Sequence, residues 1–205
     1  STGARWSPNG LTLAYVQWDV SGQNSEIVVV TLQPVGFGTG GLTISEKRVL
    51  TSDGGRKRDI TWFSDGSRLA YVNSSEGVDG LYVVGVAVPI FQNLVQGPFH
   101  LHSPAFLTGG MTLAYVSDEN GVDSVFALNG KFMGDDAVLP LAIFATGQPL
   151  LSLIRLDSHT VLVELGPRAT SRLGVLDLNT TGLTTIGGPG PNLDADFFRE
   201  PPSTV

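Results

Sequence analysis

Two histidines, His100 and His102, are the residues whose type and spacing best suit a chemical function. They stand two residues apart in the segment FHLHSPAF, and this spacing places both imidazoles on one face of a strand. Two imidazoles and a carboxylate can bind zinc or copper. The sequence offers no evident third ligand, so ordinary polar positions on a strand are the favoured alternative, and no metal or other cofactor is predicted. His159 falls in a predicted turn, where exposure to solvent is expected.

Other motifs of catalysis and cofactor binding are missing from the sequence. The glycine-rich segment GFGTGG (36–41) lacks the Lys-Ser/Thr ending of a phosphate-binding loop, and no helix is predicted after it. The acidic segments SDENG, GDD and NLDAD do not match the calcium-loop pattern. There is no G-x-S-x-G nucleophile elbow. The chain has no cysteine, which excludes thiolate catalysis, disulfides and Cys-ligated metals. The prediction is therefore a protein that is not an enzyme.

Composition narrows the class of partner. The chain has 12 Lys and Arg against 19 Asp and Glu, a formal net charge of -7. Binding DNA requires a surplus of cations to displace phosphate counterions, so nucleic acid is not expected as a partner. The longest apolar run (80–91) is interrupted by Pro89 and falls short of the ~18 residues that a membrane-spanning helix needs. Because the chain begins with Ser1 rather than Met, removal of a leader or of part of a larger precursor is expected.

A hairpin pattern recurs along the chain and predicts its architecture. Three copies end in LAYV, with their tyrosines in register at Tyr15, Tyr71 and Tyr115. A fourth, eroded copy, IRLDSHTVLVEL, has Val163 in the tyrosine position. Copies that recur every 40 to 60 residues or so indicate a repeat protein. The residue before the turn is apolar in every copy: Trp6, Trp62, Phe106 and Ile154.

Each copy predicts two strands joined by a tight turn. Asn-Gly, Asp-Gly and Gly-Gly are dipeptides that tolerate a positive φ at both central positions, as a type I′ turn requires. Within LAYV the leucine and tyrosine lie on one face of the strand and the alanine on the other. The small alanine predicts that a neighbouring sheet packs closely on its side. The turn dipeptides are Asn9-Gly10, Asp65-Gly66 and Gly109-Gly110.

Further strands complete each unit. The segments 73–86 and 117–130 share a Gly-Val-Asp triplet, which ends at Asp79 and Asp123, and each predicts a polar loop followed by a third strand. Fourth strands are expected at 46–51, 92–96, 139–145 and 183–187. Four short antiparallel strands per unit are typical of propeller blades. The prediction is an all-β propeller of about four four-stranded antiparallel blades, with repeats at 4–52, 58–97, 99–146 and 148–188, and a C-terminal strand and tail at 189–205.

These copies resemble the WD40-like, or PD40, repeat of TolB-type β-propellers, whose consensus is roughly W-S-P-D-G-x-x-I-A-[YF]. The resemblance covers about residues 4–188. It is carried in the first three units by Trp6, Asn9, Gly10, Tyr15, Trp62, Asp65, Gly66, Tyr71, Gly110 and Tyr115. It implies a scaffold, since similar blades occur in the periplasmic TolB protein, in envelope lipoproteins and in the gating propellers of prolyl-oligopeptidase-type peptidases.

The number of copies is smaller than the resemblance implies, because propellers of this family usually carry six to eight blades. An open propeller would expose unpaired strand edges and apolar blade faces. A segment of a larger propeller, or half of an assembly completed by a second chain, is therefore favoured over a closed four-bladed ring.

The function predicted first is a non-enzymatic extracytoplasmic propeller, periplasmic, envelope-bound or secreted, that acts as a protein-binding or structural platform. Its partners would be proteins, including a homo- or hetero-oligomer that completes the propeller. One alternative is the gating propeller of a peptidase or lyase whose catalytic domain is not in this chain. A second is a small-ligand or sugar-binding module that uses the central funnel.

Overall fold

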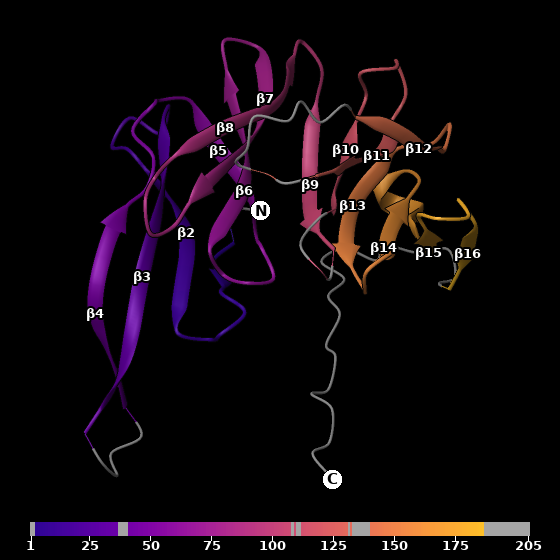
Figure 1. The fold of residues 1–205 in the computed structure, drawn as a ribbon. Helices are drawn as coiled ribbons and strands as arrows, with labels where there is room; N and C mark the ends of the chain where they lie inside the picture. Colours follow the sequence, from indigo (N-terminus) through magenta and orange to yellow (C-terminus); the bar gives the residue numbers. More distant parts are fainter. Residues whose placement is uncertain are drawn as a thin grey trace, which may run out of the picture.

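Almost all of the regular structure in the described residues is β-strand. The computed structural model describes residues 3–36, 41–107, 109, 112–130, 132 and 140–186 (Figure 1). Its strands form four antiparallel sheets of four strands each. In chain order these strands are β1 (Arg5–Trp6), β2 (Thr12–Trp18), β3 (Ser25–Val35), β4 (Gly41–Val49), β5 (Arg56–Trp62), β6 (Arg68–Ser75), β7 (Val78–Gly85), β8 (Phe91–Gly97), β9 (Leu101–Phe106), β10 (Thr112–Ser117), β11 (Ser124–Asn129), β12 (Leu141–Ala145), β13 (Leu150–Arg155), β14 (Thr160–Leu165), β15 (Arg172–Asp177) and β16 (Leu183–Thr185).

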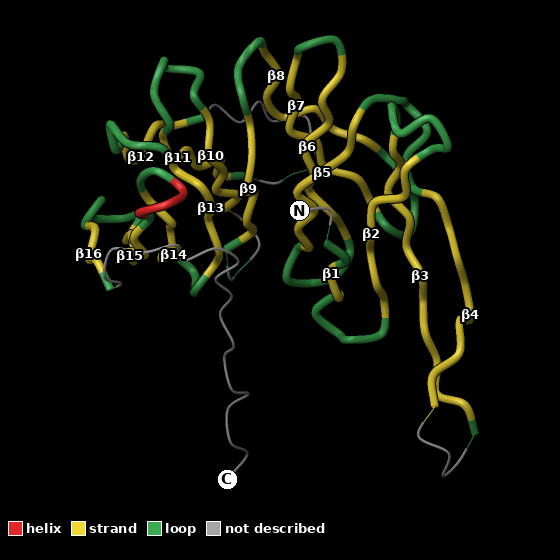
Figure 2. Tube along the Cα trace, turned by 180° about the vertical axis from the view of Figure 1, so that it is seen from behind, coloured by secondary structure: helices red, strands yellow, loops and turns green. Residues whose placement is uncertain are grey.

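Each sheet consists of four consecutive strands, as in a propeller blade, and we call the sheets blades 1 to 4 in chain order. This confirms the predicted all-β architecture. The blades follow one another along an arc that does not close into a ring (Figures 1 and 2). The first strands of consecutive blades contact each other, β1 with β5, β5 with β9 and β9 with β13, which places them on the inner side of the arc.

Some expectations lie outside the described residues. These are the predicted strand in 189–205, Gly110, and most of the glycine-rich segment between β3 and β4. The repeat boundaries remain a prediction. The helix that the described residues contain is one 3-10 turn, η1 (Arg168–Thr170), drawn in red in Figure 2. No helix in this part of the chain has the length and apolar character needed to cross a membrane.

Neighbouring blades pack face to face, and the alternation of LAYV decides which side faces which neighbour. Leu69 and Tyr71 of β6 are buried in one cluster with Ala14 of blade 1. Ala70 of β6 lies in a different cluster, with Tyr115 of blade 3. The leucine and tyrosine of blade 2 therefore face the preceding blade and its alanine faces the following one, because successive side chains of a strand point to opposite faces. The predicted close packing on the alanine side is confirmed.

The turns that follow the first strands of blades 1 and 2 are not the predicted type I′ turns. Gly10 and Gly66 have a φ of +70°, but Asn9 and Asp65 are not among the residues with positive φ. Each glycine N–H donates to the carbonyl oxygen three residues earlier, as in a type I turn followed by a left-handed glycine. The side-chain oxygens of Asn9 and Asp65 accept the N–H two residues later, at 3.0 and 2.9 Å. The prediction was wrong because these side chains act as hydrogen-bond acceptors rather than as residues that tolerate positive φ.

The fourth blade differs by one residue from the alignment of the repeats. In blade 2, Trp62 pairs with the leucine of LAYV. The equivalent of that leucine in blade 4 is Val161, which pairs with Arg155, whereas Ile154 pairs with Leu162. A one-residue shift moves a side chain to the opposite face of a sheet. Assigning Ile154 to the tryptophan position was therefore wrong, and Arg155 occupies that position.

Candidate functional site

The aspartates of the shared Gly-Val-Asp triplets connect neighbouring blades. Asp79, near the start of β7, accepts the backbone N–H of Leu101 in blade 3 at 2.9 Å. Asp123 repeats this contact one blade further on, where it accepts the N–H of Leu150 in β13 at 2.8 Å. Sequence reasoning noted the shared triplet but assigned it only to a polar loop. The identical position of the two aspartates was the signal for this role.

An arginine compensates the charge of Asp79. Nη2 of Arg58 lies 2.6 Å from Asp79 Oδ2, while its Nη1 contacts Asp59 at 2.9 Å and the carbonyl oxygen of Leu101 at 2.6 Å. Asp59 and Ser103 occupy equivalent positions in β5 and β9, and both have a positive φ, +54° and +51°. The strand register shifts at both places. Such bulges change the direction of side chains, and Arg58 bridges blades 2 and 3 beside one of them.

A buried lysine connects blades 1 and 2. The Lys57 side chain is 0% exposed, with Nζ 2.7 Å from Asp53 and 3.6 Å from Glu26, and it also donates to the carbonyl oxygen of Gly54. Its backbone N–H donates to Ser25 Oγ at 2.7 Å, so Ser25 takes in blade 1 the place of the aspartates in blades 2 and 3. These partners surround the Lys57 ammonium group, and the cluster therefore connects blade 1 to blade 2.

The two histidines of the metal hypothesis have different environments. His100 is 85% exposed, and its backbone N–H donates to Asp118 at 2.6 Å. His102 is half-buried, with Nδ1 3.1 Å from Ser103 Oγ. Burial lowers the pKa of His102 below its ordinary value, an effect that outweighs the opposing charge of Asp59, so this ring is neutral near pH 7. Within the described ranges, no three His, Asp or Glu side chains gather closely enough to hold a metal ion.

The third histidine, His159, lies in the turn between β13 and β14. Its Nδ1 is 3.5 Å from Asp157 Oδ1. Asp157 accepts the N–H groups of His159 and Thr160 at 2.9 and 2.8 Å. These hydrogen bonds lower the pKa of Asp157 to about 2. Asp157 thus stabilises this turn as Asp65 does in blade 2.

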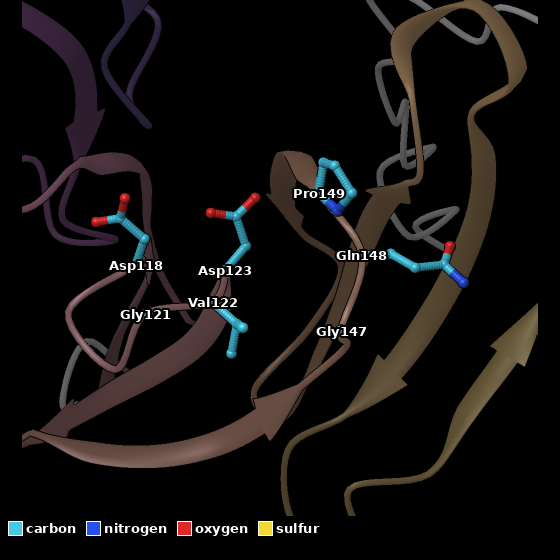
Figure 3. A pocket seen from close by; sticks show the side chains of 7 residues that line it. All are labelled: Asp118, Gly121, Val122, Asp123, Gly147, Gln148 and Pro149. Carbon is cyan, nitrogen blue, oxygen red and sulfur yellow. The ribbon is translucent and has the colours of Figure 1, made fainter.

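An open depression of about 280 Å³ lies where blade 3 meets the linker to blade 4 (Figure 3). Asp118 and Asp123 border it on one side, and Gln148 and Pro149 on the other. The two carboxylates point to the same side, whereas Gln148 points away from them (Figure 3). One oxygen of each carboxylate is held by a backbone N–H, from His100 and Leu150. Both acids are therefore fixed in direction.

The two carboxylates of this depression can accept hydrogen bonds from a partner. Its lining residues are Asp118, Gly121, Val122, Asp123, Gly147, Gln148 and Pro149, which include no nucleophile paired with a base. Glu119 lies beside Asp118 in the chain, and burial raises its pKa. Fixed carboxylates favour Lys or Arg side chains and other N–H donors of a partner.

Comparison with known proteins supports the fold and leaves the family open. No protein-family model matches the chain, and no curated protein matches it significantly in sequence. Solved structures match well in shape. TolB from Acinetobacter baumannii aligns with a TM-score of 0.69 at 15% identity, over 91% of this chain and 43% of that one. A putative TolB from Agrobacterium tumefaciens aligns with a TM-score of 0.62 at 15% identity, over 93% and 82%.

Peptidase propellers are similar to a comparable degree. A puromycin-hydrolyzing peptidase from Mycobacterium tuberculosis aligns with a TM-score of 0.64 at 18% identity, over 89% of this chain and 30% of that one. The chain therefore spans less than half the length of the Acinetobacter TolB chain and of the Mycobacterium peptidase chain. At these identities the structural similarity establishes a TolB-like propeller fold. The similar structures include both TolB proteins and a peptidase.

Proposed function

We propose that this chain is a non-enzymatic, extracytoplasmic β-propeller that serves as a protein-binding or structural platform. The observation that carries the proposal is the acidic surface around Asp118 and Asp123, whose carboxylates are held in place by backbone N–H groups of His100 and Leu150. Rigid blades that present polar loops at one end are a common basis for protein recognition. The likeness to TolB structures supports the extracytoplasmic location.

The partner that fits this surface is a protein segment rich in Lys, Arg or free backbone N–H groups. The net charge of -7 favours association with such a segment. Exposed charges steer association and are screened by salt, so binding should weaken as the ionic strength rises.

A photo-crosslinking experiment tests the platform. Benzoylphenylalanine in place of Val122, which is exposed beside the two aspartates, should capture a discrete protein partner in the cells that produce the chain. The matched control is the same substitution at Val88, an exposed valine in the loop before β8. Asp118→Asn should reduce the capture at Val122. Equal capture at both positions, or none at Val122, would contradict the proposal.

A second candidate is the gating propeller of a peptidase, which the likeness to the puromycin-hydrolyzing peptidase favours. The two functions are separated by reading the gene beyond the codon for Val205. If an α/β-hydrolase segment with a serine nucleophile is encoded there, the platform proposal is wrong and the chain is the gating propeller of a peptidase.

A further inference from the structure

We propose that Asn179 is an acceptor for N-linked glycosylation, and that the fold selects it over Asn73, the other asparagine of the chain in an N-x-Ser/Thr triplet. The two triplets are Asn73-Ser74-Ser75 and Asn179-Thr180-Thr181. In secreted proteins this triplet marks asparagines to which an oligosaccharide is attached. The inference rests on the extracytoplasmic location in the proposed function and adds a modification site to it.

The amide of Asn73 is enclosed in the folded chain. Asn73 lies in β6 and is 8% exposed. Its Nδ2 donates to Asp53 and to the carbonyl oxygen of Gly54, both at 3.3 Å, in the linker between blades 1 and 2. A Cβ built at Gly55 in the same linker would lie 2.5 Å from Asn73 Oδ1. An oligosaccharide on Asn73 would displace this linker, so a folded chain does not carry one there.

Asn179 has the opposite environment. It lies with Thr180 and Thr181 in the turn between β15 and β16, and all three residues are exposed. Asp177 Oδ1 accepts the backbone N–H groups of Asn179 and Thr180, at 2.8 and 3.1 Å. The backbone of Asn179 therefore makes its hydrogen bond to the rest of the described chain. This leaves the side-chain amide of Asn179 free to react.

The exposure of this turn does not depend on what lies beyond blade 4. The turn connects the third and fourth strands of its blade, as the segment 86–90 does in blade 2. Blade 2 has a neighbouring blade on each side, and residues 87–90 are nevertheless exposed. The connection between the two outer strands is thus open to solvent in a blade that is flanked on both sides. A further blade would leave Asn179 accessible as well.

The turn lies at the end of blade 4 that is remote from the acidic surface around Asp118 and Asp123. The antiparallel pairing places Leu150 beside Leu165 at one end of the sheet, and Thr160 beside Asp177 at the other. The N–H of Leu150 is held by Asp123, so the first of these ends adjoins the acidic surface. Asp177 immediately precedes the turn at the second end.

A glycan on Asn179 is therefore compatible with the platform. It would leave the acidic surface free to bind a partner. It would also lie beside β16, which is the outermost strand of blade 4 in the described residues. An exposed edge strand can pair with strands of other chains, and a bulky polar group beside it hinders such pairing.

The modification is a group transfer from a lipid-linked oligosaccharide. The Nδ2 atom of Asn179 forms a bond to C1 of the first sugar, and the bond between C1 and the lipid pyrophosphate breaks. The pyrophosphate leaves with the lipid, and the amide nitrogen loses one proton. Nothing is oxidised or reduced. Thr181 supplies the hydroxyl that completes the triplet.

Secretion of the full chain from a yeast host, behind a cleavable leader, tests the site. The secreted chain should show the mass increase of one oligosaccharide, and peptide-N-glycosidase should remove this increase. Asn179→Gln and Thr181→Ala should each abolish it, whereas Thr181→Ser keeps the triplet and should retain it. The matched control is Ser75→Ala, which removes the other triplet at an exposed position and should leave the mass increase unchanged.

Two results would overturn the inference. One is a secreted chain without an oligosaccharide, and the other is a secreted, folded chain that carries its oligosaccharide on Asn73. An unmodified chain that is still captured through Val122 would leave the platform standing. A chain that is modified at Asn179 but shows no such capture would overturn the platform and leave the glycosylation site standing.

Discussion

The carboxylate of Asp123 accepts the backbone N–H of Leu150 at 2.8 Å and so connects blade 3 to blade 4. Asp79 and Leu101 make the same connection between blades 2 and 3 at 2.9 Å. In the described residues the four blades are separate sheets with no ladder between them. Such side-chain contacts, together with the apolar clusters, therefore determine how each blade sits on the next.

Removing the Asp123 carboxylate should destabilise the protein. Asp123→Ala leaves the N–H of Leu150 without its acceptor, which should lower the free energy of unfolding by about 1–3 kcal/mol. Asp123→Asn keeps an acceptor oxygen and should cost less. Urea denaturation at pH 7 measures both. Glu46→Ala, at an exposed ion pair with Arg48, is the control and should stay within about 0.5 kcal/mol of the parent. An equal loss for Asp123→Ala and this control would refute the role of Asp123.

Replacing the buried lysine tests the cluster between blades 1 and 2. Lys57→Met keeps the apolar stem but leaves Asp53 and Glu26 without their shared cation. The expected loss is about 1–3 kcal/mol of unfolding free energy, less than for a fully buried pair, because both carboxylates are partly exposed. Lys47→Met, at an exposed lysine whose Nζ donates to Gln17 Oε1, should change stability little. Matching effects at the two lysines would show that the cluster contributes nothing.

Substituting a turn glycine should lower the stability of the protein because of the backbone conformation alone. Gly10 has a φ of +70°, and a Cβ built there meets nothing within 4 Å. Gly10→Ala should therefore cost about 1–2 kcal/mol from the backbone conformation. Gly10→Asn should cost less, since asparagine tolerates this region. Gly41→Ala is the control, because that glycine has no positive φ and only ordinary contacts. Thermal unfolding compares the three, and a stable Gly10→Ala would contradict the turn geometry.

His102 should make stability depend on pH in the weakly acidic range. Burial holds the pKa of His102 below its ordinary value, so the folded chain binds this proton less readily than the unfolded chain. The contribution is fully present above about pH 6.5 and is lost as the pH falls below that value. His102→Gln should reduce the drop in unfolding free energy between pH 7.5 and 5.5. His159→Gln, at an exposed turn, should retain the drop of the parent. If His102→Gln also retains it, burial of the imidazole is not the cause.

Much of the fold is predictable because its signals are local. The alternation of LAYV, the glycines of the turns and the spacing of the copies each act within a few residues, and they place the strands of the first three blades. The predicted turn type was wrong for a physical reason. Asn9 and Asp65 can satisfy a turn either by positive φ or through their side chains, and the sequence does not distinguish the two.

The candidate site was less predictable because its contacts join distant parts of the chain. The Gly-Val-Asp triplet was visible, but the N–H that Asp123 accepts belongs to a different blade. The turn between the first two strands of blade 4 is one residue shorter than the same turn in blade 2. Arg155, rather than Ile154, therefore occupies the position of Trp62.

By itself the sequence determined a β-rich chain of repeated four-stranded units, because strand pattern and turn chemistry are properties of short segments. Only the tertiary structure decided that Asp79 and Asp123 connect blades, that Lys57 is enclosed, and that Trp6 is open where Trp62 is buried. These outcomes depend on which blade lies against which. Identical side chains therefore acquire different roles according to their neighbours.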